Sequence, residues 1–291
     1  MLAKGDRRQA YFGLSLALVQ LCLGYLNTKP WLTMPCKFAL NIFVGSWISA
    51  YLFLQMHEAA HGLVFGPCHP RLNKIYGIFL NLFMGIPVFS FFKKHHIHHH
   101  KYEGDDLYDL EYPTDLEVKL FNHNFLLRFL WLALSPIIMM IRSKTVSTKK
   151  QGLTQEDCWN LIIVISFDLL LLTTGWHYVI SHFSMALFTA TGVNLIGVWA
   201  VASHTTLFGL KQDTISYYGW MNAFYLNLGY HVEHHDFPNI PARFLPQVRQ
   251  LASEFYEHNQ DLDSFYTATL YFLHDSSVGI QSRLKRKHTW L

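Results

Sequence analysis

Long apolar stretches separated by short polar turns restrict this chain to a membrane fold. A helix needs about 20 mainly apolar residues to cross a bilayer, and four stretches approach that length, at 11–26, 38–56, 160–176 and 178–201. Hydrophobic residues make up 51% of the chain and charged residues only 15%, which leaves too much apolar surface for a soluble fold. The low charge and the 16% aromatic content also exclude disorder and a coiled coil. The sequence therefore predicts an all-α membrane protein.

The four stretches are expected to cross the membrane as two hairpins. A short turn with Asn27 and Pro30 joins the first pair, and residues 175–177 join the second pair. Two further apolar runs, at 76–92 and 125–141, are shorter or are interrupted by Gly, Pro or Arg. We predict interfacial or re-entrant helices for these two runs rather than spans.

Basic residues indicate which face of the membrane is cytosolic. Lys and Arg gather at the N-terminus, between the second and third spans, and near the C-terminus, whereas the hairpin turns carry little beyond Lys29. With four spans these basic segments all fall on one side, which the positive-inside rule makes the cytosol. We expect one domain over 1–291 with both termini, residues 57–159 and a histidine-rich cap at 202–291 on that side. The net charge of +3 gives no indication of nucleic-acid binding.

Histidine is the unusual residue, because the chain has 18 of them and half fall into clusters with the spacing that metal ligation requires. An i, i+4 pair on a helix directs two imidazoles towards one point. The second cluster contains His-x-x-His-His in two registers, the third repeats this spacing once, and a single histidine stands three residues past the last span. These are His57 and His61, residues 95–100, the trio His231, His234 and His235, and the single His204.

Each cluster alone has a simpler interpretation. His57-Glu58-x-x-His61 is also the pattern of zinc proteases, with Glu58 as the base. The run at 95–100 could be a zinc-binding polar tract, the third cluster could lie on the surface, and His204 could be a buried, hydrogen-bonded histidine. Together the clusters favour two metals, because one zinc takes only three or four protein ligands.

The membrane setting favours iron among the metals that imidazole binds. Imidazole suits iron, copper and zinc alike, but removal of hydrogen from an unactivated alkyl chain is beyond any side-chain acid or base. Nitrogen ligation leaves carboxylates and amides to orient imidazole N–H groups. The candidates for that role are Glu58, Glu233, Asp236 and Asn239. The acidic run Asp105, Asp106 and Asp109 fits this role and a solvated loop equally well.

The third cluster also carries a family resemblance. Residues 227–241, Asn-Leu-Gly-Tyr-His-Val-Glu-His-His-Asp-Phe-Pro-Asn-Ile-Pro, resemble the third histidine box of the sphingolipid Δ4-desaturases (dihydroceramide desaturases) in the membrane fatty acid desaturase superfamily. The resemblance covers roughly 35–287 and includes Ser216-Tyr-Tyr-Gly219, Lys101-Tyr-x-Gly104 and Pro113-Thr-Asp-x-Glu117. It implies a diiron centre whose ligands are His57, His61, His96, His99, His100, His231, His234 and His235.

The same resemblance assigns the remaining histidines. The motif Lys101-Tyr-x-Gly104 sets the register of the second box, so that His95 and His98 become bystanders. His204 matches the last histidine of an extra family motif, and we expect it to be the ninth ligand. Trp199 departs from the family, because the motif usually carries its first histidine there. The N-terminus also lacks most of the family's polar leader with its myristoylation signal, since Met1-Leu2 cannot be myristoylated.

The resemblance implies O2-dependent introduction of a trans double bond between C4 and C5 of dihydroceramide, in the endoplasmic reticulum membrane. The sequence contains no heme-binding His-Pro-Gly-Gly and no Gly-rich nucleotide fingerprint, so electrons are expected from cytochrome b5 or a similar carrier. Three alternatives stay open. They are C4-hydroxylation or another fatty acyl desaturation, a zinc membrane protease that uses His57, Glu58 and His61, and a non-catalytic metal- or lipid-binding protein.

Overall fold

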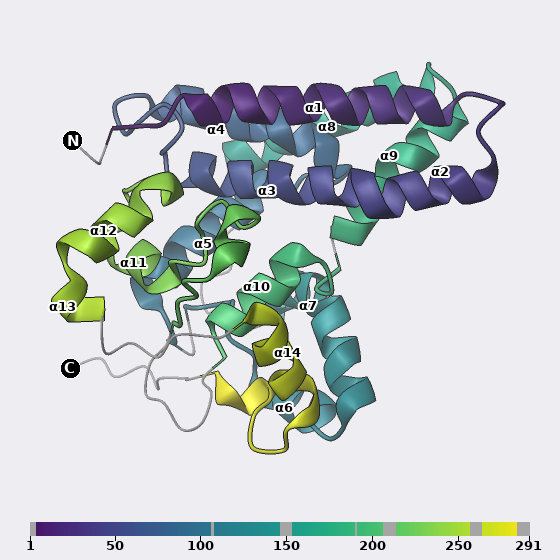
Figure 1. Ribbon diagram of the computed structural model, residues 1–291. Coiled ribbons are helices and arrows are strands. Elements are labelled where there is room, and N and C mark those ends of the chain that lie inside the picture. Colours follow the sequence, from purple (N-terminus) through teal and green to yellow (C-terminus); the bar gives the residue numbers. More distant parts are fainter. Residues whose placement is uncertain are drawn as a thin grey trace. The chain divides into compact units, whose positions relative to one another are not determined.

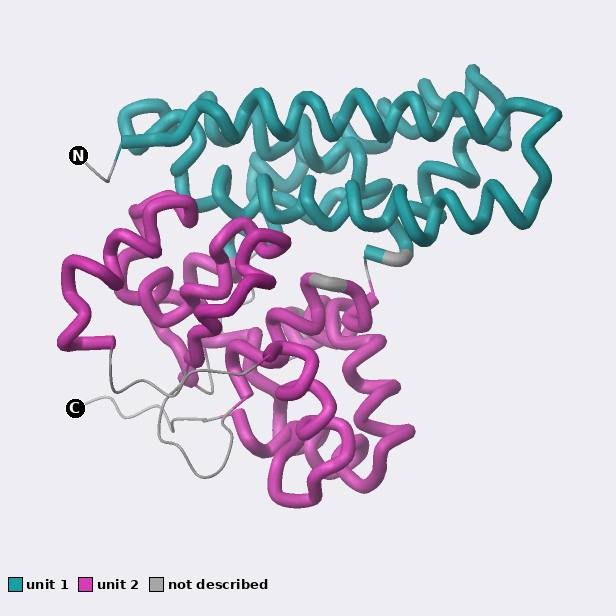
Figure 2. Tube along the Cα trace, viewed as in Figure 1, with its two compact units in different colours: residues 1, 3–94, 151–190 teal, residues 2, 95–150, 191–291 magenta. Residues whose placement is uncertain are grey.

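The computed structural model describes residues 4–105, 108–145, 153–189, 191–205, 214–256 and 264–283. The regular elements in these residues are helices (Figure 1), which confirms the all-α prediction for this part of the chain. The chain groups into two compact units, coloured separately in Figure 2. Unit 1 comprises residues 3–94 and 151–190, and unit 2 comprises residues 95–150 and 191–291.

Unit 1 is built on long apolar helices. Helix α1 (Arg8–Asn27) runs beside α2 (Met34–Leu40), the π-helical turn η1 (Asn41–Gly45) and α3 (Ser46–Ala60), as Figure 1 shows. Residues 8–27 and 34–60 are each long and apolar enough to cross a membrane, and they coincide with the first two predicted spans. Large apolar side chains such as Leu14 and Leu18 are exposed on α1. A lipid-facing helix has such a surface.

A sharp bend follows these helices. Helix α4 (Pro70–Asn81) and the 3-10 turn η2 (Leu82–Met84) meet α5 (Phe89–Tyr102) at 117°, as a broken span or a re-entrant loop would. The Asn81 side chain fixes the bend, because its Nδ2 donates to the Ile86 carbonyl and its Oδ1 accepts from the Phe89 N–H. Gly85 lies in the bend with φ +65°, a region that glycine adopts at little cost. The bend falls in the run at 76–92, for which an interfacial or re-entrant helix was predicted.

The core of unit 1 holds the end of α3 in place. Leu52, Met56, Leu80 and Phe89 are fully buried in one cluster between α3, α4 and α5. The Tyr76 hydroxyl donates to the Gln9 carbonyl and so ties α4 to α1. The last turn of α3, which carries the first histidine box, is therefore held on two sides.

The second predicted hairpin differs from the prediction. Helices α8 (Gln155–Leu172) and α9 (Trp176–Thr189) pack together in unit 1, but α8 carries three carboxylates, Glu156, Asp157 and Asp168, and is not among the candidate spans. The prediction of one continuous span over 178–201 was wrong. A new helix, α10 (Leu195–Ser203), begins after Asn194, whose side chain accepts from the N–H groups of Ile196 and Gly197. Asparagine is a preferred N-cap, so it starts a helix here rather than continuing one.

The apolar run at 125–141 also differs from the prediction. It forms one helix, α7 (Phe125–Thr145), and its residues 125–143 are long and apolar enough to cross a membrane. Its two arginines, Arg128 and Arg142, are buried and form hydrogen bonds with other segments. Arg142 pairs with Glu117, and Arg128 donates to the carbonyls of Phe272, Asp275 and Val278. By length and composition, the candidate spans are thus not the four that the sequence predicts.

Unit 2 packs short helices around α7. Its other elements are the part of α5 from His95 on, α6 (Asp115–Phe121), α10, η3 (Trp220–Ala223), α11 (His231–Asp236), η4 (Ala242–Phe244), α12 (Leu245–Leu251), α13 (Ser253–Tyr256), α14 (Phe265–His274) and η5 (Ile280–Ser282). Trp131, Leu132, Val201, Phe272 and Ile280 form the buried core between α7, α10 and α14. This core fixes the end of α10, where His204 lies.

Candidate metal centre

Seven of the nine predicted ligands belong to unit 2, since only His57 and His61 lie in unit 1. On α5, His96 and His100 are four residues apart, and their ring centroids are 4.6 Å apart. Helix α11 brings the third box against them, with the His100 and His235 centroids 4.2 Å apart. His204 is the C-cap of α10, and its ring centroid lies 4.7 Å from the ring centroids of both His99 and His231. Segments far apart in sequence therefore bring their histidines together.

The ligand atoms in unit 2 form two sets. The first set comprises one ligand atom from each of His99, Glu103, His204 and His235. These four atoms lie within 4.8 Å of one another. His96, His100 and His234 offer atoms within the same distance of one another. The members are buried or half-buried.

Carboxylates determine which nitrogen of three of these rings carries the proton. The distances are 3.1 Å from His96 Nδ1 to Glu111, 2.8 Å from His99 Nδ1 to Asp109, and 3.0 Å from His235 Nδ1 to Glu103. An ionised carboxylate only accepts hydrogen bonds, so Nδ1 must donate in each pair. The lone pair of each neutral ring is then on Nε2. This is the arrangement that metal-ligating histidines usually have.

The Nε2 atoms meet inside the cluster. His96 Nε2 lies 3.1 Å from His100 Nε2, and His204 Nε2 lies 2.9 Å from His231 Nε2. Two nitrogens that bind the same metal at about 2.1 Å, with an N–metal–N angle of about 90°, are separated by about 3.0 Å. His99 Nε2 and His204 Nδ1 are buried and have no hydrogen-bond partner among the described residues. The donor set therefore fits metal ions.

The pKa values of His99 and His204 are shifted in opposite directions. Burial lowers the pKa of His99, but the Asp109 and Glu111 carboxylates outweigh it and raise the pKa to about 9. Burial and the neighbouring His231 and His99 lower the pKa of His204 well below its ordinary value. The His99 ring, which faces Asp109 and Glu111, therefore holds its proton more tightly, whereas His204 is held neutral.

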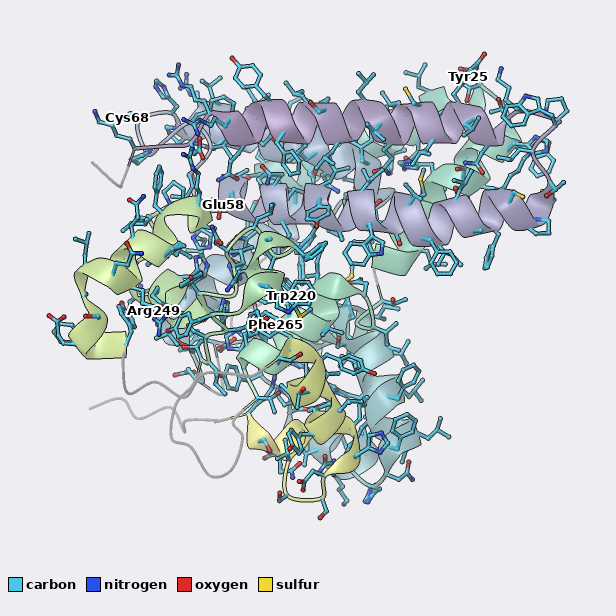
Figure 3. All side chains as sticks on the ribbon, in the orientation of Figure 1. Tyr25, Glu58, Cys68, Trp220, Arg249 and Phe265 are labelled. Carbon is cyan, nitrogen blue, oxygen red and sulfur yellow. The ribbon has the colours of Figure 1, made fainter. Side chains whose placement is uncertain are left out.

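The first box lies at the end of α3 in unit 1. His57 is buried, and its ring centroid is 4.8 Å from that of His61, as expected for an i, i+4 pair. Glu58, labelled in Figure 3, accepts a hydrogen bond of 2.8 Å from Gln9 Nε2 on α1. Its other oxygen is 3.7 Å from His57 Nδ1. Glu58 therefore links the box to α1.

The predicted orienting residues have different surroundings. Glu233 is buried and accepts from the Ser216 and Tyr218 hydroxyls at 2.8 and 2.9 Å. Burial raises its pKa. The family-like segment at 216–219 therefore holds α11, and Arg249 of α12, labelled in Figure 3, covers the Tyr218 ring. Asp236 accepts from the Tyr256 hydroxyl.

The remaining predicted positions and the two expected bystanders vary in exposure. Asn239 is exposed, and Asp105 accepts from the N–H of Tyr108. Asp106 lies outside the described residues. His95 and His98, the expected bystanders, are half-buried, and His98 contacts the Tyr102 ring.

Glu103 and Glu111 were missed by the sequence reasoning. Glu103 stands four residues after His99, and this helical spacing could have placed it on the ligand face of α5. Glu111 has no such signal, because an irregular segment separates it from the box. Trp199, at the position where the family usually has histidine, packs its ring against that of His231 at 5.0 Å.

Comparison with known proteins places this chain in a family. A family model described as fatty acid desaturase matches residues 29–266. The chain is similar to the sphingolipid delta(4)-desaturase of Drosophila melanogaster, with 35% identity over 249 residues that cover 85% of this chain and 76% of that protein. The human protein of the same name is 34% identical over 246 residues, which cover 83% of this chain and 74% of its own.

A relative from Caenorhabditis elegans has a broader name, "Putative sphingolipid delta(4)-desaturase/C4-monooxygenase". It is 34% identical over 261 residues, which cover 88% of this chain and 71% of that protein. Matches over this share of both chains indicate an oxidoreductase with a lipid substrate. The chain belongs to the fatty acid desaturase family, in its sphingolipid Δ4-desaturase branch.

Proposed function

We propose that this protein introduces a trans double bond between C4 and C5 of dihydroceramide, and so forms ceramide, at a centre of two irons. The observation that carries the proposal is the set of histidines in unit 2, in which carboxylates leave Nε2 available on three rings. The names of the relatives support the substrate.

The ligands that we propose are the nine predicted histidines. Within unit 2, His99, His204, His231 and His235 would hold one iron, and His96, His100 and His234 would contribute to the other. His57 and His61 are assigned to the second iron by their box pattern and family membership. When bound, such a pair of irons with O2 supplies the oxidising power that removal of hydrogen from an alkyl chain requires.

The protein's own groups keep this centre oriented and dry. Asp109 fixes the His99 ring, and its Oδ2 also accepts from the N–H of Gly104, which holds the turn after α5. Buried aromatic rings line the histidines on two sides, Tyr112 beside His99 and Trp199 beside His231. Exclusion of water from such a site limits side reactions of reactive species.

C4-hydroxylation is the second candidate function. The name of the Caenorhabditis elegans relative includes a C4-monooxygenase. Both reactions begin with removal of the same kind of hydrogen, and they diverge only in the step after that removal. Cells that express the protein and receive labelled dihydroceramide should accumulate labelled ceramide. Labelled phytoceramide alone would favour the hydroxylase, and no change in either lipid would refute both.

A zinc protease built on His57, Glu58 and His61 explains much less of the chain. It gives no role to the seven histidines of unit 2, and Glu58 is bound to Gln9 on α1. Turnover of labelled lipid separates this protease, and a protein that only binds metal or lipid, from the desaturase.

We further propose the endoplasmic reticulum membrane as the location, with cytosolic termini and a cytochrome b5-like electron donor. The positive-inside rule supports this orientation. Cysteine labels near Lys149 and after Arg286, both outside the described residues, should react from the cytosolic side. Labels that react on opposite sides would contradict this topology. Reduced cytochrome b5 should support turnover by the purified protein, and failure of every such carrier would contradict the donor assignment.

A further inference from the structure

The Glu103 carboxylate faces two of the histidines from different elements. Its Oε2 lies 3.0 Å from His235 Nδ1, and its Oε1 lies 3.6 Å from His204 Nδ1. His235 comes from α11, and His204 follows α10. The carboxyl group is largely buried, with 17% of the side chain exposed. The Glu103 carboxylate therefore lies close to Nδ1 of two histidine rings that come from different segments of the chain.

The two nitrogens of the His204 ring have different neighbours. His204 Nε2 is 2.9 Å from His231 Nε2, inside the cluster, whereas its buried Nδ1 has no hydrogen-bond partner among the described residues. The Glu103 carboxylate therefore approaches the His204 ring at Nδ1, the nitrogen that does not face His231 Nε2. A small rotation of the ring or the carboxylate would close the 3.6 Å gap to a hydrogen bond.

The backbone around Glu103 explains why the carboxylate points inward. Helix α5 ends at Tyr102, and Gly104 follows with φ +74°. The Gly104 N–H donates to Asp109 Oδ2, the same oxygen that contacts His99 Nδ1. The turn that directs Glu103 towards the cluster is thus fixed by the carboxylate that orients another ligand.

We infer that Glu103 is a positioning residue that accepts the Nδ1 protons of His204 and His235 together, and so presents Nε2 of both rings to one metal. This inference rests on the metal centre proposed above and goes beyond it, because the centre was expected from histidines alone. A carboxylate behind a ligand ring fixes the tautomer and raises the basicity of the ligating nitrogen. Here one carboxylate does so for two ligands.

Metal titration of the purified full chain tests this role without turnover. Anaerobic Co(II) binding is followed by its absorption in the wild type, in Glu103→Gln, in Glu103→Ala, and in Glu254→Gln as an exposed control. Loss of the carboxylate should weaken binding of one metal by about 10- to 100-fold. Glu103→Gln should weaken it less than Glu103→Ala, because its one oxygen accepts from one ring only. The control should bind as the wild type does.

The saturated spectra separate orientation from direct ligation. A positioning residue leaves the coordination number of bound Co(II) unchanged at saturation, so the absorption intensity of the loaded Glu103→Gln variant should equal that of the wild type. A changed intensity at saturation would overturn the inference, because Glu103 would then be a ligand. Wild-type affinity in Glu103→Ala would overturn it as well. A wild-type chain that binds no Co(II) would refute the metal centre itself, and Glu103 with it.

Discussion

Units 1 and 2 supply their predicted ligands in different ways. Unit 1 offers two histidines on one turn of α3, and the buried core around Met56 holds that turn. Unit 2 offers seven from α5, α10 and α11, with three carboxylates between them. A pair on one helix needs only the helix, whereas ligands from separate segments need polar contacts that hold each ring. The two units should therefore respond differently to substitution.

The largest expected effect is that of the double variant His57→Ala, His61→Ala. An i, i+4 pair is directed towards one point, so both rings should serve one metal. Activity should be abolished, while iron should fall from about two atoms per chain to about one, because the ligands that we propose for the other iron lie in unit 2. Iron analysis of the purified protein checks this, with His69→Ala, an exposed histidine of unit 1, as the control. Loss of both irons, or of neither, would contradict the division between the units.

The second box tests the same division within one helix. His96→Ala, His99→Ala and His100→Ala should each abolish turnover, because each ring lies in the cluster of unit 2. His98→Ala should keep substantial activity, because its ring contacts Tyr102. Ceramide formation by membranes that carry each variant is the measurement. Equal loss in all four variants would show that the register is mistaken.

Removal of an orienting group should have a smaller effect than removal of a ligand. Asp109→Asn replaces a carboxylate that contacts His99 Nδ1 and accepts from Gly104 and Glu111 N–H groups. We expect iron affinity or activity to fall by about 10- to 100-fold. The control is Asp115→Asn, at an exposed position on α6. Wild-type affinity in Asp109→Asn would mean that carboxylates in unit 2 do not orient the ligands.

The smallest expected effect concerns the break between α9 in unit 1 and α10 in unit 2. Asn194→Ala removes the side chain that accepts from Ile196 and Gly197, so unfolding free energy should fall by about 1 kcal/mol. Thermal unfolding in detergent measures the change. A stabilised variant would instead support one continuous helix over 178–201, because alanine favours a helix interior.

The sequence predicts those candidate ligands that lie at a regular helical spacing from one another. The i, i+4 and His-x-x-His-His patterns made His57, His61 and the second box visible, because helical geometry fixes which residues share a face. Glu111 was not visible, because an irregular segment brings it to His96. Glu103 has a helical spacing of four residues from His99, but only histidines were expected as ligands, so Glu103 was not among the predicted residues.

The fold shows the same limit. The all-α class and the first two apolar helices follow from hydrophobic length, which sequence records directly. The start of α10 depends on Asn194, a polar interruption in a run that is otherwise apolar. Helix α7 was predicted as interfacial or re-entrant because of Arg128 and Pro136, but carbonyls of distant segments accept hydrogen bonds from Arg128. Such compensation cannot be read from the run itself.

The metal content of the purified wild-type chain tests the central claim most directly. We predict about two irons per chain after anaerobic, iron-replete preparation, because the histidines and carboxylates described above are too many for one ion. Zinc should not replace iron under these conditions. One zinc per chain with no iron would contradict the diiron centre and favour the protease-like interpretation of the first box.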